Sequence, residues 1–212
     1  MDILNLDYFN SSIWDSPFEL NNDIAPCSIC KKDTSHRLEL DGSIEIIYKG
    51  IEVIETVCLN CLSERKYGFE HQVEGGFLTK DGILTESEKY KFLKNSDDYS
   101  LLLQPKEEQL LTIEKSKMDN LIHTPPFNAY QGARWLIHCN DFMKFIGTWE
   151  HDDFVKHSPN NNAKIFFNEI VDNWNGDDFY DKQFGPNKSK YAESAFYAFE
   201  CLHCKQQRGY VE

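Results

Sequence analysis

Short apolar runs bounded by turn residues predict strands, rather than helices, in the first third of the chain. Three such runs cover residues 37–40, 44–48 and 51–57, and glycine-containing turns separate them. Strands joined by tight turns fold back on one another. We therefore expect the two ends of the 27–61 segment to meet.

Helical patterns begin further along the chain. A capping-box pattern at Thr85 predicts a helix over residues 86–93, and Pro105 stands where the first residue of a longer helix would be. The apolar face of this second helix continues to the break at Thr124, which two prolines follow. A third helix is predicted over residues 163–174, where bulky apolar residues recur at every fourth position.

Strand patterns return around the last helix. The pattern of residues 134–139 predicts a short strand. A second strand is predicted over residues 195–201, where alternate positions place aromatic side chains on one face. Residues 208–211 can return beside the second of these strands as a hairpin. Its tip would hold the sequence Cys201-Leu-His-Cys204.

Seven cysteines, six of them in three Cys-x-x-Cys pairs, supply the candidate chemistry. Cys27 and Cys30 form the first pair, Cys58 and Cys61 the second, and 27 residues lie between the pairs. Each pair can present two thiolates on one tight turn, and two facing pairs form the tetrahedral ligand set of a structural zinc ion. We therefore expect one tightly held Zn²⁺ on these four sulfur atoms.

Three other uses of the two pairs have to be weighed against zinc. They could be buried reduced thiols, two disulfides or one redox-active dithiol. A thioredoxin-like dithiol needs a βαβ context that this segment lacks, and an odd number of cysteines does not allow complete pairing. The spacing of the two pairs favours the metal.

These patterns together predict an α+β fold. An N-terminal zinc-ribbon-like module is expected over residues 1–100, and a C-terminal lobe with a small antiparallel sheet and helices over residues 101–212. The two lobes can share one core. Residues 1–26 are acidic with scattered aromatic side chains, which we expect to pack on the cysteine module.

The remaining cysteines predict a second metal site. Cys139, Cys201 and Cys204 offer three sulfur ligands, so the fourth would have to come from His138, His203 or a neighbour. Adjacent residues of a strand face opposite sides, which should hold His138 away from Cys139. The alternative is three buried thiols without a metal.

The same separation argues against a Cys-His nucleophile at residues 138 and 139. The sequence has no phosphate-cradling glycine motif, no His-Glu-x-x-His motif and no paired-carboxylate motif. We therefore expect a protein that is not an enzyme.

Composition and charge narrow the choice of partner. The chain has 212 residues, 22 Lys plus Arg and 35 Asp plus Glu, which gives a formal net charge of −13. Such a chain repels phosphate backbones, so nucleic-acid binding is unlikely on electrostatic grounds and a basic protein partner is favoured. The sequence shows no signal peptide and no membrane-spanning apolar run, and we expect it to act in the cytoplasm.

The strongest local excess of acidic residues lies between residues 150 and 181. This range holds eight acids against two lysines. A solvated face without a partner is the ordinary explanation. If the face does bind a basic partner, the candidate contacts are three acids and three flanking aromatic residues: Trp174, Asp177, Asp178, Phe179, Tyr180 and Asp181.

Several motifs occur in a characteristic order, beginning with the two N-terminal cysteine pairs. They continue with Thr124-Pro125-Pro126-Phe127, Gln131-Gly132, the run from Arg134 to Asp141, Phe145-Ile146-Gly147, the run from Phe199 to Cys204, and Gly209-Tyr210. In these motifs the chain resembles the CbrC family. Residues 150–190 match the family little, and Phe142-Met143 stand where the family pattern has a further cysteine.

The resemblance implies a bacterial protein associated with tolerance to colicins, from a family found beside polymorphic toxins. We therefore expect an immunity or antitoxin protein that binds and neutralises a bacterial toxin, of the colicin or contact-dependent growth inhibition type. Its acidic charge would suit a basic nuclease as the toxin. The alternative is a regulatory zinc-binding adaptor that contacts another basic protein or RNA.

Overall fold

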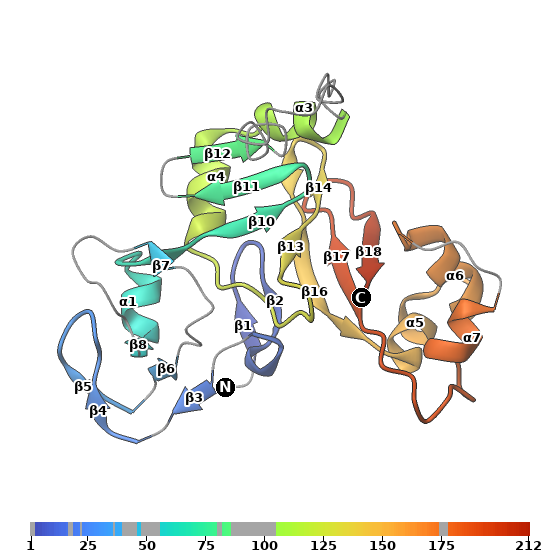
Figure 1. Cartoon of the computed structure of the whole chain (residues 1–212), viewed down its shortest axis with the longest axis horizontal. Coiled ribbons are helices and arrows are strands. Elements are labelled where there is room, and N and C mark those ends of the chain that lie inside the picture. Colours follow the sequence, from blue (N-terminus) through green and yellow to red (C-terminus); the bar gives the residue numbers. More distant parts are fainter. Residues whose placement is uncertain are drawn as a thin grey trace, which may run out of the picture.

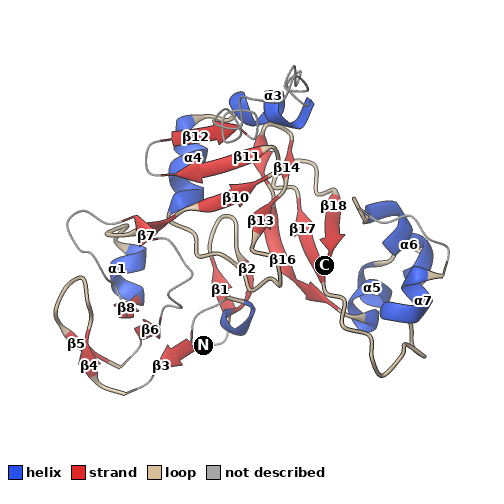
Figure 2. Ribbon diagram, viewed as in Figure 1, coloured by secondary structure: helices blue, strands red, loops and turns tan. Residues whose placement is uncertain are grey.

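The protein is described by a computed structural model that covers residues 3–16, 19–21, 23–35, 37–39, 46–47, 56–79, 82–85, 105–173 and 178–212. The fold is α+β, as predicted, with several small sheets and short helices (Figures 1 and 2). The helix predicted over residues 86–93 lies outside the described residues.

The described residues in the first third of the chain form short strands, one 3-10 helix and one α-helix (Figure 1). In chain order these are β1 (Ile3–Asn5), β2 (Asn10–Ser12), η1 (Ile13–Asp15), β3 (Glu19–Asn21), β4 (Ala25–Pro26), β5 (Asp33–Thr34), β6 (Arg37–Glu39), β7 (Ile46–Ile47), β8 (Thr56–Cys58), α1 (Leu59–Ser63) and β9 (Gly68–Phe69). Strand β6 lies between β3 and β8 in an antiparallel sheet. Strand β7 pairs with β9 rather than with its neighbour β6.

The described middle part of the chain supplies three strands of a four-stranded sheet, whose fourth strand is Arg134–Trp135, and two helices beside it. The elements are β10 (His71–Val73), β11 (Gly76–Thr79), β12 (Gly82–Thr85), α3 (Pro105–Leu111) and α4 (Lys115–Ile122). The single long helix predicted from Pro105 is therefore two helices. The first ends where the Thr112 hydroxyl donates to the carbonyl of Gln109, and Ile113 then turns its side chain into the core.

The last third contains the central antiparallel sheet and a group of three helices. The elements are β13 (Arg134–Trp135), β14 (Ile137–His138), β15 (Asp141–Phe142), β16 (Lys144–Trp149), α5 (His151–His157), α6 (Ala163–Ile170), α7 (Phe179–Gln183), β17 (Phe196–Glu200) and β18 (Gln207–Val211). The predicted hairpin at the end of the chain is confirmed as β17 and β18. Strand β13 pairs in parallel with β10, which joins this part to the four-stranded sheet.

The central antiparallel sheet consists of β16, β17 and β18, with β17 in the middle. Strand β17 is buried on both faces, because it separates two hydrophobic clusters. Tyr197 and Phe199 point into the main core, while Phe196 and Ala198 point to the cluster beneath α5, α6 and α7. This division follows from the two-residue period of a strand. The three helices thus cover the face of the central sheet that is opposite to the main core (Figure 1).

The main core is centred on Phe127, which is 2% exposed. Its ring stacks on Phe145 with 4.3 Å between centroids and meets Trp135, Tyr197 and Phe199 at 5.4 to 5.5 Å. The same cluster includes residues from both sides of position 100: Tyr8, Phe9, Val73, Leu78, Leu110, Leu121, Trp135 and Tyr210.

The N-terminal segment belongs to this main core. Tyr8 and Phe9 are buried against Phe142 and Phe145, and the carbonyl of Tyr8 accepts a hydrogen bond from the backbone of Phe145 at 2.8 Å. The prediction that these rings pack on the cysteine module was wrong. Backbone pairing with β16 directs them to the centre of the protein.

A buried ionic network fastens the C-terminal strand. Arg208 donates to Glu74 at 3.0 Å and to Asp172 at 2.7 Å, and its side chain is only 15% exposed. It also donates to the carbonyl of Ile137 at 2.8 Å, while Glu74 accepts from the backbone of Ile137 at 2.9 Å. Because these charges are paired and hydrogen-bonded, loss of one partner would leave the other buried without compensation.

We expect Phe127→Ala to lower the free energy of unfolding by roughly 3 to 5 kcal/mol, because it removes a ring that four other rings contact. Chemical denaturation in the presence of excess zinc would measure the change. Trp14→Ala is the matched control, since Trp14 is 64% exposed and should cost little. Equal losses in the two variants would contradict this description of the core.

Candidate metal centres

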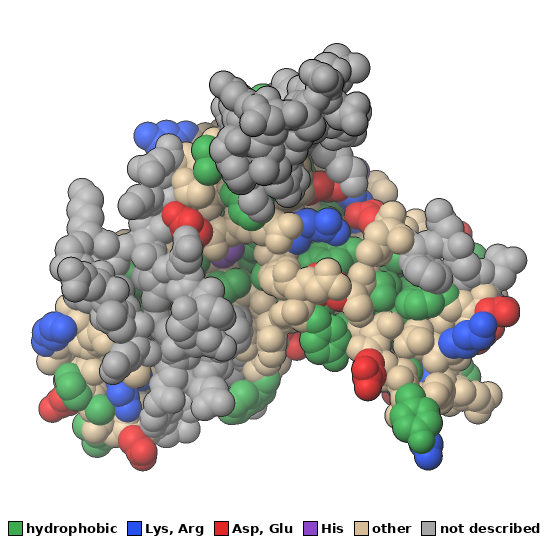
Figure 3. All heavy atoms as spheres, in the orientation of Figure 1, with side chains coloured by type: hydrophobic (Ala, Val, Ile, Leu, Met, Phe, Trp, Pro, Cys, Tyr) green, Lys and Arg blue, Asp and Glu red, His purple; other side chains and the backbone are tan. Residues whose placement is uncertain are grey.

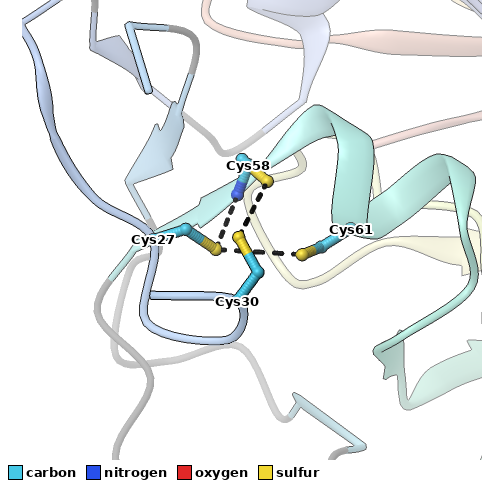
Figure 4. A group of neighbouring side chains, drawn as sticks. All are labelled: Cys27, Cys30, Cys58 and Cys61. Atoms are coloured by element: carbon cyan, nitrogen blue, oxygen red, sulfur yellow. Dashed lines mark hydrogen bonds between the residues drawn. The ribbon is translucent and has the colours of Figure 1, made fainter. Parts of the chain in front are cut away.

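Four cysteine sulfur atoms converge at one end of the N-terminal part (Figure 4). The Sγ atoms of Cys27 and Cys61 are 4.0 Å apart, and those of Cys30 and Cys58 are 3.9 Å apart. A disulfide needs a sulfur–sulfur distance of about 2.05 Å, so no disulfide joins Cys27 to Cys61 or Cys30 to Cys58. A tetrahedral ion with metal–sulfur distances of about 2.3 Å places its ligands about 3.8 Å apart. The arrangement fits one metal ion.

Backbone hydrogen bonds shape the first cysteine pair into a tight turn. The amide of Cys27 donates to the carbonyl of Lys32 at 3.0 Å, and the amide of Lys31 donates to the carbonyl of Cys27 at 2.9 Å. Lys31 adopts the left-handed conformation with φ of 60°. The amide of Ile29 points at the Cys27 sulfur at 3.4 Å, so the turn supplies a donor to the thiolate as well as holding it.

The second pair joins a strand to a helix. Cys58 is the last residue of β8 and precedes the first residue of α1, while Cys61 lies within α1 (Figure 4). The amide of Cys58 donates to the Cys27 sulfur at 3.4 Å. The two pairs are therefore linked by the backbone as well as by any bound ion.

The protonation state of each of these thiols depends on that of its neighbours. Burial acts to raise the pKa of Cys27, but hydrogen bonds from backbone amides outweigh it and bring the pKa to about 7. The pKa values of Cys58 and Cys61 are raised, first by burial and then by the neighbouring sulfur atoms. One thiolate thus opposes the formation of the others, and a divalent cation at the centre would reverse that effect.

Three of the four cysteines belong to the core of this module. Cys27, Cys58 and Cys61 are between 0% and 3% exposed. They pack with five other buried residues: Leu38, Val57, Leu62, Tyr67 and Phe69. So small a cluster gives limited hydrophobic stabilisation, and a bound metal would make up for it.

A second group brings together His138, Cys139, Cys201 and Cys204, with all ligand atoms within 4.8 Å of one another. The Nδ1 atom of His138 is 3.2 Å from the Cys139 sulfur and 3.4 Å from the Cys204 sulfur. The four residues offer one nitrogen and three sulfur ligands, another set typical of zinc. This group can also hold one metal ion.

The prediction that His138 and Cys139 point apart was wrong. Cys139 is not part of a strand, because Cys139 and Asn140 form the two-residue turn between β14 and β15. Both have positive φ, at 53° and 54°, as the tightest hairpin turns require. This turn carries the Cys139 sulfur back to the imidazole ring of His138.

The Cys201 turn repeats the hydrogen bonds of the Cys27 turn at the same offsets. The amide of Cys201 donates to the carbonyl of Gln206 at 2.8 Å, and that of Lys205 to the carbonyl of Cys201 at 3.2 Å. The amide of His203 points at the Cys201 sulfur at 3.4 Å, and Lys205 has φ of 63°. Two turns far apart in sequence therefore share one metal-binding geometry.

His203 has a different role from His138. Its Nε2 atom lies 2.9 Å from a carboxylate oxygen of Asp141, so the ring points away from the ligand group. Asp141 is 4% exposed and also accepts from the Tyr8 hydroxyl at 2.7 Å and from the amide of Phe142 at 2.9 Å. Sequence reasoning missed this carboxylate, although it stands in the run from Arg134 to Asp141 that carries the family resemblance.

The two groups differ in exposure. Cys30 is the only partly exposed cysteine of the first group, whereas Cys139 and Cys204 are exposed. The pKa of Cys139 is raised to about 11 by desolvation and by the sulfurs of Cys204 and Cys201. Backbone hydrogen bonds lower the pKa of Cys204. An ion in the second group would be within reach of solvent and chelators.

The predicted partner-binding residues are only partly described, because Trp174 and Asp177 lie outside the described residues. Asp178 and Asp181 are exposed, with side-chain exposures of 75% and 57%. Phe179 is half-buried. Tyr180 is 2% exposed and its hydroxyl pairs with Nδ1 of His151 at 2.8 Å, so its ring is part of the core and not free for a partner.

The fold and these two groups define an α+β protein with a four-cysteine site near its N-terminus and a histidine-and-three-cysteine site in its C-terminal half. The chain belongs to the uncharacterised protein family UPF0167, whose pattern matches residues 5–212. No curated protein and no solved structure matches the chain. Among the described residues, no helix has both the length and the apolar character needed to cross a membrane.

We expect Cys58→Ser to abolish metal binding at the first site and to unfold the N-terminal module, because metal-binding energy there is folding energy. Elemental analysis and limited proteolysis of freshly purified protein would measure the two effects. Ser63→Ala, on the same helix but outside the ligand group, is the control. A variant that lost its zinc yet kept native protease resistance would contradict a structural role for the metal.

We expect the wild-type protein to carry two zinc ions and Cys204→Ser to carry one with the fold retained, because the second site is exposed and its surroundings are held by the main core. The variant His138→Ala should behave in the same way. His203→Ala is the control, since His203 contacts Asp141 and not the ligand group. Loss of zinc in His203→Ala alone would show that the fourth ligand has been misassigned.

Proposed function

We propose that this protein is a zinc-stabilised immunity protein that binds a basic bacterial toxin and neutralises it by covering or distorting its active site. The observation that carries the proposal is the net charge of −13, together with two metal sites that each have four protein ligands. The resemblance to the CbrC family supports it.

The ligand sets favour binding over catalysis. A catalytic zinc usually has three protein ligands and leaves one position open for water or substrate, whereas a structural zinc has four. Each group here supplies four donor atoms. We infer that zinc in both groups holds the scaffold together and takes no part in a reaction.

Acidic side chains are spread over the surface, and several are already paired. Asp181 binds Lys164 at 2.7 Å, Asp178 lies 3.8 Å from Lys182, and Glu150 pairs with Lys188. All these pairs are exposed, so each contributes little to stability and can be exchanged for a partner's basic residue at small cost. On the face drawn in Figure 3, acidic side chains appear over separate parts of the molecule rather than in one patch.

The lobe formed by α5, α6 and α7 is our choice for the partner face. Exposed apolar side chains here include Ile165 in α6, at 55% exposure, and Tyr191 in the segment between α7 and β17, at 75%. An interface needs such anchors beside its charged residues, because buried apolar groups carry most of the affinity and complementary charge speeds the encounter. Ile165 and Tyr191 replace Tyr180 as the proposed anchors, and Asp178 and Asp181 remain the proposed acidic contacts.

A regulatory zinc adaptor is the second candidate, and the exposure of Cys139 and Cys204 favours it. An accessible metal can be gained or lost as conditions change. Under this alternative, removal of the second zinc would switch binding to a basic partner on or off, whereas an immunity protein would bind its toxin constantly.

We expect the protein to co-purify with the toxin domain encoded beside its gene and to restore growth when both are expressed. The double variant Asp178→Lys and Asp181→Lys should slow association at low salt by about tenfold while leaving zinc content and stability unchanged. Glu114→Lys, at an exposed acid that precedes α4, is the control. Failure of the wild-type protein to bind or protect would refute the immunity role, and an unchanged rate in the double variant would refute only the choice of face.

A further inference from the structure

A cavity of about 320 Å³ opens between the end of α5, the start of β16 and the tip of the β17–β18 hairpin. Strand β16 contributes Lys144 and Ile146 to its lining, which share one face of that strand. The last turn of α5 contributes Lys156 and His157. The hairpin tip contributes Glu200, Leu202 and Lys205.

The lining is basic in a protein that is strongly acidic. Three lysines and one glutamate give it a charge of about +2 in a chain with a net charge of −13. Glu200 lies 3.3 Å from Lys205. Within the described part of the chain, no carboxylate forms an ion pair with Lys144 or Lys156.

A purely structural explanation accounts for only part of this arrangement. Lys156 stands at the C-terminal end of a helix, where a positive charge is favourable. Lys144 lies opposite Glu200 on the neighbouring strand, where opposite charges are also favourable. Neither fact explains why three lysines line the same cavity, where their like charges repel one another. An anion in the cavity would turn this repulsion into attraction.

His157 adds an imidazole ring to the lining. Its ring stacks on Trp149 with 4.6 Å between centroids, and its Nδ1 atom lies 3.3 Å from the side-chain amide nitrogen, Nε2, of Gln207. Because that amide donates to Nδ1, the neutral ring carries its proton on Nε2. Burial, and after it the neighbouring charge of Lys156, lowers the pKa of His157.

We propose that this cavity binds a small phosphate-bearing molecule. Lysine ammonium groups are compact charges that suit phosphate oxygens, and three lysines line this cavity. Ile146 and Leu202 add an apolar part to the lining, which an organic group attached to the phosphate would contact. The volume lies at the lower end of the range for ligand pockets, so the ligand is small.

The cavity and the second metal site both use residues of the turn from Cys201 to Lys205. Leu202 and Lys205 belong to the turn that carries Cys201 and Cys204, so a metal that orders this turn also positions two residues of the cavity. The proposal does not depend on the immunity role, because it concerns a different surface and a different kind of ligand. The test below therefore uses the zinc-loaded full chain without any toxin.

The experiment is isothermal titration calorimetry at low salt, with inorganic phosphate in one arm and adenosine monophosphate in the other. We expect saturable binding of one ligand per chain that weakens as salt rises. Tighter binding of adenosine monophosphate would identify a phosphate ester as the ligand, and equal binding would identify the phosphate group alone. No saturable binding of either probe at millimolar concentrations would overturn the proposal.

Two variants test the residues. Lys144→Met combined with Lys156→Met should weaken binding at least tenfold, and Lys156→Gln alone, at an exposed helix end, should weaken it several-fold without affecting the fold. Lys182→Gln is the matched control, because Lys182 also lies in the last turn of a short helix but outside the cavity. Equal affinity in Lys156→Gln, the double variant and the control would overturn the proposal.

Discussion

Thiolates held close together repel one another, and only a cation at their centre can make such an arrangement favourable. In this protein the constraint applies twice, because each of two ligand groups has all its donor atoms within 4.8 Å. The pKa values of Cys58 and Cys61 are raised first by burial and then by the neighbouring sulfur atoms, so both effects oppose the thiolate form unless a cation is bound. The N-terminal strands are short and their core is small, so a metal bound by the four cysteines would stabilise their arrangement more than hydrophobic packing does.

The rest of the protein depends on the central sheet, whose middle strand is buried on both faces. On one face lies the aromatic core around Phe127, and on the other the helical lobe that we propose as the partner surface. The second ligand group joins the tip of the β17–β18 hairpin to the turn between β14 and β15, so it would be held by packing as well as by a bound metal. This difference explains why we expect loss of metal to unfold the first site and to leave the fold around the second site intact.

Local patterns in the sequence were enough to predict the α+β fold, the first group of four cysteines and the terminal hairpin. They could not predict how His138 meets Cys139, because this depends on two residues with positive φ in a turn that resembled a strand. They also could not predict the bond from Tyr8 to Asp141, since these residues are 133 positions apart and neither carries a local signal. The long helix predicted from Pro105 failed where Ile113 is drawn into the core, which is a tertiary effect.

The separation of Tyr8 from its partner has a consequence for synthesis on the ribosome. The most distant cysteines of the first group are 34 positions apart, so this site can close and take up metal while the remainder is still being translated. The second group spans 66 positions and is complete only when Cys204 has emerged. Tyr8 and Phe9 leave the ribosome first yet must wait for β15 and β16, so a nascent chain exposes two aromatic rings for most of its production.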